Sequence, residues 1–385
     1  MATTFKALGN NDVVNSKTML HESIPITGSI LYGNPTQTYV DAGTETAVKT
    51  FSHGMFQSVH DYPHLSSSSN QLFDLTTCYS NNSPISSSSN THNAKKINMY
   101  TSLAQVLMGH ESSGTSTTGV IRKVRDFDED GDLTGGTKIN DAFVLNFSRL
   151  LTKDEIKKGS FTLELGVNAT YASPFQKRVA LKDTNAADNF FVNSPAGEYG
   201  ILYATNTAGT GLVNPTGGTT SVKAGLVFYQ AGIAVISGSI FDSTATPASI
   251  STDGHLSASA LLISNQAASH SNMFEAALTG TSINNIATAI RKRIYNLEFN
   301  NTTELHSTIY FCRLNNTDFN YSTNPTYISG SKLKVKTNAT DMPISYATTV
   351  GLYGANNELL AVAKLSEPLK KTPQNEITLR VRLDY

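Results

Sequence analysis

The side chains with the clearest potential for metal binding lie in one acidic run, residues 126–133, which reads DFDEDGDL. Asp126, Asp128 and Asp130 alternate with other residues and a glycine follows, as in the first half of a calcium-binding loop. Carboxylates at every second residue can converge on one hard cation if the loop curls. The spacing therefore predicts a weak Ca²⁺ site formed by Asp126, Asp128, Asp130 and Asp132.

The second half of this run departs from the calcium-loop pattern. The twelfth position, which supplies a bidentate glutamate in such loops, is Thr137, and the glycine-rich segment around it does not read as a helix. Two alternatives need no metal ion. The run forms a solvated acidic turn, or its charge is offset by the upstream bases Arg122, Lys123 and Arg125.

No other group of residues has a spacing that is diagnostic of a catalytic or metal site. His53, His60 and His64 are close in sequence, but Pro63 disfavours the helix that would pair the last two as zinc ligands. We interpret these histidines as surface or interface residues. Serine, histidine and aspartate are plentiful, but none has nucleophile-elbow spacing. We therefore expect no catalytic residues, no enzyme activity and no cofactor other than Ca²⁺.

The composition favours a protein built from strands and turns. Of 385 residues, 39% are hydrophobic and only 15% are charged, and Ser, Thr, Asn and Gly are abundant. The net charge of −1 leaves no basic excess for phosphates, so nucleic acid is not an expected partner. No apolar run approaches the roughly 20 residues of a membrane span, so a membrane is not expected either. We expect Cys78 and Cys312 to be free thiols.

The clearest strand pattern lies near the end of the chain. Residues 346–353 and 358–365 flank a turn whose glycine and asparagine residues tolerate positive φ. In residues 376–385 apolar and polar side chains alternate strictly, and Ile377, Leu379, Val381 and Leu383 share one face. The pattern predicts a C-terminal three-stranded antiparallel segment whose last strand closes a sheet.

The chain as a whole is predicted to be mainly β, with a β-sandwich-like body, long loops and a few short helices. Residues 1–50 read as an N-terminal arm, either loosely packed with one or two edge strands or ordered on a neighbouring subunit. Residues 51–340 form the β-rich body, with loop insertions around 170–220 and 242–280. Residues 341–385 form the C-terminal β segment.

Within the body, several elements have recognisable signals. Helices are predicted over 97–107, ended by Gly109, and over 283–294, capped by Ser282. A capping-box pattern at 152–155 predicts a short helix that ends at Gly159. Alternation and apolar runs predict strands over 142–150, 161–167, 295–299 and 308–313, and a central hairpin over 226–229 and 233–240.

Several stretches resemble segments of a known protein family. Residues 348–353 (TTVGLY) and 357–365 (NELLAVAKL) are similar to the closing segment of virion structural proteins of contractile-tailed phages. Residues 51–59, 105–109 and 127–133 resemble further segments of the same family, so the similarity covers most of the chain. The C-terminal hairpin also resembles regions of phage tail-collar and fibre proteins.

The resemblance implies a structural subunit of a phage particle, in the tail, the baseplate or its fibre-attachment region. Its expected partners are other virion structural proteins and further copies of itself, in a virion assembled in the host cytoplasm. A neck or capsid-surface (decoration) protein is the nearest alternative. An alternative of another class is a carbohydrate-binding or carbohydrate-cleaving receptor protein, which would need exposed aromatic clusters or a paired-carboxylate site.

Overall fold

The computed structural model describes residues 5–25, 47–87, 89–116, 119–133, 135–151, 155–167, 175, 178–205, 221–241, 273–322, 328–329, 332–333, 338 and 340–385. The chain divides into two compact units. Unit 1 comprises Met1–Leu20 and Glu304–Tyr385, and unit 2 comprises His21–Thr303. Two strands, β1 (Val13–Pro25) and β17 (Ile294–Leu314), contribute residues to both. Half of the predicted arm and most of the 242–280 insertion lie outside the described residues.

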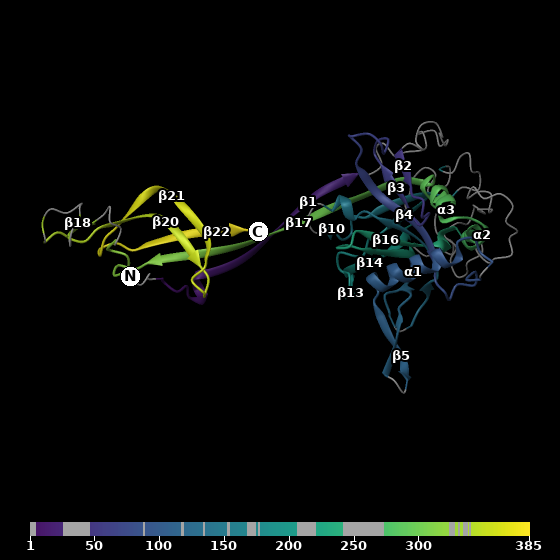
Figure 1. Cartoon of the computed structure of the whole chain (residues 1–385), viewed down its shortest axis with the longest axis horizontal. Helices are drawn as coiled ribbons and strands as arrows, with labels where there is room; N and C mark the ends of the chain where they lie inside the picture. Colours follow the sequence, from purple (N-terminus) through teal and green to yellow (C-terminus); the bar gives the residue numbers. More distant parts are fainter. Residues whose placement is uncertain are drawn as a thin grey trace. The chain divides into compact units, whose positions relative to one another are not determined.

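Unit 2 is built on a large antiparallel sheet (Figure 1). From β17 its strands follow in the spatial order β11 (Thr162–Gly166), β12 (Arg178–Lys182), β14 (Gly197–Thr205), β15 (Ser221–Phe228), β16 (Ile233–Ser237), β9 (Asp141–Asn146), β4 (Gln71–Tyr79), β3 (Gln57–His60) and β2 (Val48–Thr50). Off this path, β10 (Glu155–Ile156) pairs with β17, and β13 (Phe191–Ser194) pairs with β14. Two small hairpins join β5 (His110–Ser116) to β6 (Gly119–Val124) and β7 (Phe127–Asp128) to β8 (Lys138–Ile139).

The central strands of this sheet are buried on both faces. Along β9, Phe143 and Leu145 belong to one hydrophobic cluster, whereas Ala142 and Val144 belong to a second. This division follows from the period of two in a strand, which sends successive side chains to opposite faces. The predicted mainly β, sandwich-like fold is confirmed.

Aromatic rings show that the sheet curls around the first cluster. The ring of Phe147, just after β9, lies 6.4 Å from that of Phe73 on β4 and 5.6 Å from that of Phe299 on β17 (between centroids). Strands β9 and β17 are far apart in the hydrogen-bonded order. Their rings can meet only if the sheet bends back on itself, which encloses the core.

Three helices are described, and the sequence signals for two of them are confirmed. The first, α1 (Asn93–Leu107), is followed by Gly109 with φ of 74°. The other two are α2 (Met273–Gly280) and α3 (Ile283–Arg291), and the Ser282 hydroxyl accepts a hydrogen bond from the Asn285 N–H (3.3 Å), which caps α3. None of these described helices is long and apolar enough to cross a membrane.

Unit 1 contains the C-terminal strands. Strands β20 (Ser345–Tyr353) and β21 (Leu359–Lys371) form a hairpin, and a second small hairpin joins β18 (Ile328–Ser329) to β19 (Lys332–Leu333). The last strand, β22 (Ile377–Asp384), pairs antiparallel with the second half of β17. The three predicted strands are therefore present, but the third pairs with β17 instead of extending the hairpin.

Three expectations differ from the structure. Glu155 and Ile156 form strand β10, paired with β17, in place of the predicted helix, whose first residues, 152–154, lie outside the described part. The predicted 170–220 insertion contains strands β12, β13 and β14. The two strands predicted over 295–313 are one continuous strand of 21 residues, β17. The boundary between the two units lies within β17, between Thr303 and Glu304.

Candidate functional site

The turn of the acidic run is anchored by Asp128. This residue and Lys138 are paired across the β7–β8 ladder, and the Lys138 ammonium forms an ion pair with the Asp128 carboxylate. The same carboxylate accepts hydrogen bonds from the backbone N–H groups of Asp130 (3.0 Å) and Gly131 (3.1 Å). Asp128 is fully buried, and its carboxylate supplies the hydrogen-bond acceptor for these backbone N–H groups of the turn.

The protonation of the run is set by burial and by contact between carboxyl groups. Burial, followed by a hydrogen bond with the Asp130 carboxyl, raises the pKa of Asp128. The same hydrogen bond lowers the pKa of Asp130. Burial also raises the pKa of Glu129, and the positive charge of Lys223 opposes that rise. The ammonium groups of Lys138 and Lys223 offset part of the repulsion within the run without a metal ion.

The basic residues that offset this charge differ from those expected from the sequence. The ion pairs described for the run are those of Asp128 with Lys138 and of Asp130 with Lys223 (3.9 Å). Both lysines lie downstream in the chain, whereas the sequence pointed to the adjacent upstream bases. Lys138 lies beside Asp128 because the β7–β8 register pairs the two residues. Lys223 approaches Asp130 from strand β15.

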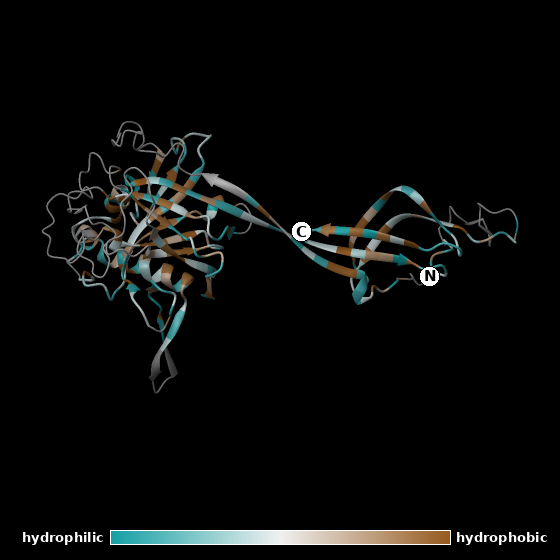
Figure 2. Cartoon of the chain, turned by 180° about the vertical axis from the view of Figure 1, so that it is seen from behind, coloured by the Kyte–Doolittle hydropathy of each residue, from teal (hydrophilic) through white to brown (hydrophobic). Residues whose placement is uncertain are grey.

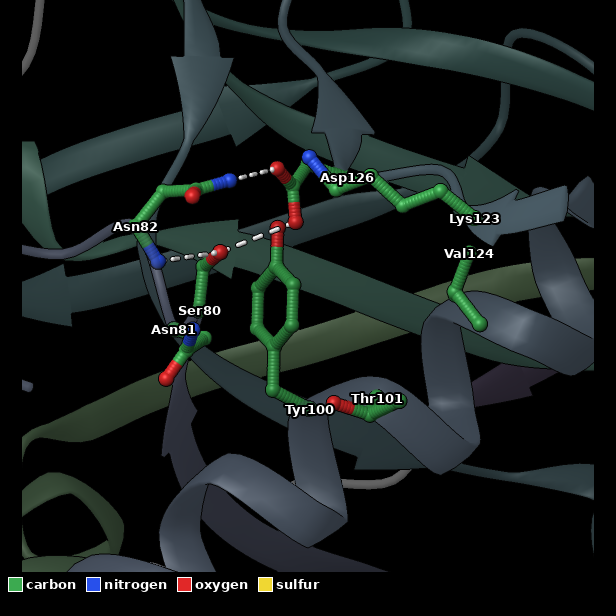
Figure 3. Close-up of a pocket in the computed structure, with 8 residues that line it drawn as sticks. All are labelled: Ser80, Asn81, Asn82, Tyr100, Thr101, Lys123, Val124 and Asp126. Carbon is green, nitrogen blue, oxygen red and sulfur yellow. Dashed lines mark hydrogen bonds between the residues drawn. The ribbon is translucent and has the colours of Figure 1, made fainter. Parts of the chain in front are cut away.

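Asp126 contacts a different part of unit 2 (Figure 3). Its carboxylate accepts hydrogen bonds from the hydroxyl of Ser80 (2.9 Å) and the side-chain amide of Asn82 (2.6 Å). The Tyr100 ring projects toward the same carboxylate in Figure 3, and its hydroxyl donates to the Ile139 carbonyl (2.7 Å). Burial and then the charge of Asp126 raise the pKa of Tyr100 well above its ordinary value.

These side chains surround a small pocket of about 200 Å³. Pockets that enclose organic ligands usually measure roughly 300–1,000 Å³, so this one is smaller than a usual ligand pocket. The polar groups of Ser80, Asn82 and Asp126 bond to one another, as the dashed lines in Figure 3 show. Its lining residues are Ser80, Asn81, Asn82, Tyr100, Thr101, Lys123, Val124 and Asp126.

The structure therefore does not bring the four predicted calcium ligands together around one point. Asp126 bonds to Ser80 and Asn82, the Asp128–Asp130 pair is matched by lysines, and Asp132 is exposed. Among the described residues, no group of three or more His, Cys, Asp or Glu side chains is arranged to hold a metal ion. A titration tests Ca²⁺ binding by the run directly.

Calorimetric titration of Ca²⁺ into chelator-treated protein is expected to give no saturable heat up to millimolar concentration. The reason is that the Lys138 ammonium already occupies the position from which a cation would neutralise Asp128. Asp128→Ala and Asp130→Ala serve as controls. Saturable binding that either substitution abolishes would show instead that the run rearranges around the ion.

The three histidines predicted to lie at a surface do not form a metal site. The Nδ1 atom of His53 accepts a hydrogen bond from the Met55 N–H (3.0 Å), and its ring stacks on that of Phe51. The rings of His60 and His64 lie 6.3 Å apart between centroids. These contacts of His53 stabilise the conformation of the segment before β3.

A pair of buried carboxyl groups escaped the sequence analysis. Asp141, at the start of β9, is 7% exposed, and Glu275 on α2 is 5% exposed. A hydrogen bond joins the two carboxyls, and the Ser83 hydroxyl donates to Asp141 (2.8 Å). Burial and then Glu275 raise the pKa of Asp141 to about 8. Neither lines the pocket of Figure 3, so the pair is a structural contact between β9 and α2.

Lys96 on α1 is a second buried charged residue that the sequence did not reveal. Its ammonium donates to the carbonyl oxygens of Leu278 and Thr281 at the C-terminal end of α2. Those carbonyls lack partners within the helix, so Lys96 caps α2 from a neighbouring element. Burial lowers the pKa of Lys96 to about 7.

The most unusual surface lies on unit 1. In its described part no apolar side chain is buried, and the buried side chains are Ser307, Thr308, Ser345 and Lys371. Figure 2 shows hydrophobic and hydrophilic residues alternating along its strands. Its exposed large apolar residues are Phe5, Leu8, Val14, Met19, Leu20, Phe319, Tyr321, Met342, Tyr346, Tyr353, Leu359, Leu360, Val362 and Tyr385.

Comparison with protein-family models, curated proteins and solved structures finds no match. The class of the protein therefore follows from its own structure. It is a mainly β chain in which unit 2 contains both hydrophobic clusters, while unit 1 consists of strands without a buried apolar centre in the described residues.

Proposed function

We propose that the chain is a structural subunit of a phage particle, located in the tail, the baseplate or its fibre-attachment region. It assembles through protein–protein contacts with its own copies and with other virion proteins, in the host cytoplasm, and it carries out no catalytic turnover. One observation carries this proposal, namely that unit 1 presents apolar strands without burying an apolar side chain in its described part.

The physical argument is the difference between the two units. Unit 2 buries side chains such as Phe143, Leu226 and Ile286 completely, as a self-sufficient domain does. In unit 1 the apolar face of β22 is only half-buried. Burying such a side chain completely is worth roughly 1.5–3 kcal/mol, and these residues gain only part of it in the isolated chain. Contact with further subunits would supply the remainder.

The resemblance to phage virion proteins selects the setting of this assembly. It is strongest in residues 348–365, which form most of the β20–β21 hairpin of unit 1. The hairpin that resembles tail-collar and fibre segments thus belongs to the unit whose apolar strands need a partner. A neck or capsid-surface position is a variant of the same proposal.

The first test locates the protein. Mass spectrometry of purified phage particles is expected to find the chain in a fixed copy number, and electron microscopy with a labelled chain is expected to place it in the tail. Its absence from purified particles would refute the proposal. A position on the head or neck would correct the location and keep the structural role.

Deletion of residues 376–385 is expected to give chains that are insoluble or fail to enter particles. The deletion removes β22 and exposes the edge of β17 from Ser307 to Leu314. Incorporation is measured by quantitative mass spectrometry of particles from a complemented deletion phage. Arg380→Gln is the matched control, since this exposed side chain leaves the alternation of β22 intact. Incorporation of the truncated chain at normal copy number would contradict the prediction.

A further inference from the structure

The β20–β21 hairpin has an open edge. Among the described strands, β20 pairs only with β21, so the backbone groups along its other side have no strand partner there. A two-stranded hairpin alone is marginally stable in water, and three or more strands are usually needed. An added strand at this edge, which the described strands do not supply, would therefore stabilise the hairpin.

The hairpin is nevertheless fixed in place at its base. The buried Lys371 ammonium donates to the Asn316 carbonyl (3.2 Å) and to the side-chain oxygen of Asn320 (2.9 Å). At the other end of β20, the ring of Phe5 packs on that of Tyr353 (4.7 Å between centroids). A strand held at both ends loses little conformational entropy when another strand joins it.

The edge of β20 lacks two of the devices that normally prevent strand addition, namely charged residues and proline. Its sequence, SYATTVGLY, contains no charged residue and no proline. Neighbouring strands are protected, since β21 contains Lys364, Glu367 and Pro368, and β22 exposes Arg380 and Arg382. Charged residues or proline protect β21 and β22, but β20 has neither. We therefore expect β20 to be the strand that receives a partner.

The charge pattern is compatible with a second copy of this chain as that partner. When two identical strands pair antiparallel about a two-fold axis, each charged residue lies opposite or diagonal to like charges near the centre, which is destabilising. An uncharged strand avoids this cost. The net charge of the whole chain is only −1, so two copies do not repel each other strongly. Two hairpins joined in this way make a four-stranded sheet, which meets the size that one hairpin lacks.

We infer that two copies of the chain pair β20 to β20, antiparallel about a two-fold axis, in the order β21-β20-β20-β21. The contact also covers the exposed rings of Tyr346 and Tyr353 at the ends of the strand. This inference deepens the proposed function, because it names the partner of unit 1. It implies a dimer or an even-numbered assembly built from dimers.

The test uses opposite charges at Thr348, an exposed residue near the centre of β20 that falls in a register shift and has no paired residue on β21. In a two-fold pair centred on Thr349, the two copies of residue 348 are diagonal neighbours on one face, about 7–8 Å apart. Thr348→Lys and Thr348→Glu alone therefore place like charges together. Mixed, they place a lysine beside a glutamate.

Light scattering and native mass spectrometry of the full chain measure the assembly. The unmodified chain is expected to be dimeric or even-numbered, each variant alone to dissociate at least tenfold more readily, and the equimolar mixture to form mixed dimers. Thr378→Lys on β22 is the matched control and leaves the assembly unchanged. Monomers or odd-numbered oligomers of the unmodified chain would overturn the inference. Single variants that assemble like the unmodified chain, or an equimolar mixture that forms no mixed dimers, would overturn it as well. Circular dichroism confirms that the variants are folded.

The outcomes also separate this inference from the proposed function. A chain found in particles but monomeric in solution refutes the β20 contact and leaves the structural role intact. A chain that forms the charge-dependent dimer but is absent from particles refutes the role in the phage and leaves the contact intact. A strand of another protein on β20 would give a complex in which the Lys and Glu variants do not rescue one another, which overturns the inference.

Discussion

Replacing Asp183 with alanine is expected to lower the free energy of unfolding of unit 2 by about 3–6 kcal/mol. The Asp183 carboxylate is fully buried and accepts hydrogen bonds from the N–H groups of Gly159 (2.8 Å) and Phe161 (2.9 Å) and from the Tyr229 hydroxyl (3.1 Å). Alanine leaves three donors without their acceptor, and each unsatisfied buried group costs roughly 1–3 kcal/mol. Urea denaturation followed by circular dichroism measures the loss.

Two further variants locate the cause of that loss. Asp188→Ala, at an exposed position in the same segment, is expected to change stability by less than about 0.5 kcal/mol. Asp183→Asn keeps one acceptor but turns an amide donor toward the remaining donors, so it is expected to be intermediate or equally damaging. A loss below about 1 kcal/mol for Asp183→Ala would show that water replaces the carboxylate in these contacts.

Replacing Asp141 with asparagine is expected to stabilise unit 2 at pH 8 by a few kcal/mol and to change little near pH 4. The pKa of Asp141 rises from 3.8 to about 8 in the folded protein, mainly because of burial. Between these values the folded state retains a proton that the unfolded state has lost. Stability from this group is therefore present at low pH and falls as the pH rises from about 4 to about 8.

The titratable groups around Asp141 also favour its protonated form in the folded protein. The titratable groups that interact with it are Glu275, Cys78, Tyr79 and Tyr100, all of which become negative or stay neutral. Asparagine can still accept from Ser83 and donate to Glu275, so it imitates the protonated acid. Lys96 affects stability in a different pH range. Burial lowers its pKa to about 7 in the folded protein, so the stability that it contributes rises with pH above that value.

Urea denaturation of the unmodified chain and of Asp141→Asn at pH 5 and pH 8 tests the prediction by difference. The difference between the two proteins is expected to grow with pH, and Asp188→Asn serves as the exposed control. Equal stability of the two proteins at both pH values would show that Asp141 ionises in the fold at its ordinary pKa. A larger difference at pH 5 would reverse the sign and contradict the burial argument.

Local patterns in the sequence determined the type and approximate position of many elements. Alternating residues predicted β22, and an apolar pair of runs predicted the β15–β16 hairpin at the centre of the sheet. Ser282 and Gly109 predicted the start of α3 and the end of α1. These signals succeeded because a cap, a turn and a strand face depend on residues within a few positions of one another.

The candidate site was predicted only in part. The sequence located the acidic run and its turn, but it placed the compensating charge upstream. Lys138 faces Asp128 because of the β7–β8 register, and Lys223 comes from a strand nearly a hundred residues away in the chain. The contacts of Asp141 with Glu275 and of Asp183 with Tyr229 also join distant segments. No local pattern distinguishes such residues from exposed acids.

Only the tertiary structure decided how the chain divides and which surfaces it leaves uncovered. Alternation along β22 indicates that one face is apolar, but it does not say that the strand pairs with β17 or that its apolar face is only half-buried. Likewise the sequence of β20 shows an uncharged strand, while its open edge follows from the pairing of every described strand around it. Strand partners and burial depend on the packing of residues far apart in sequence, whereas strand faces depend on the backbone alone.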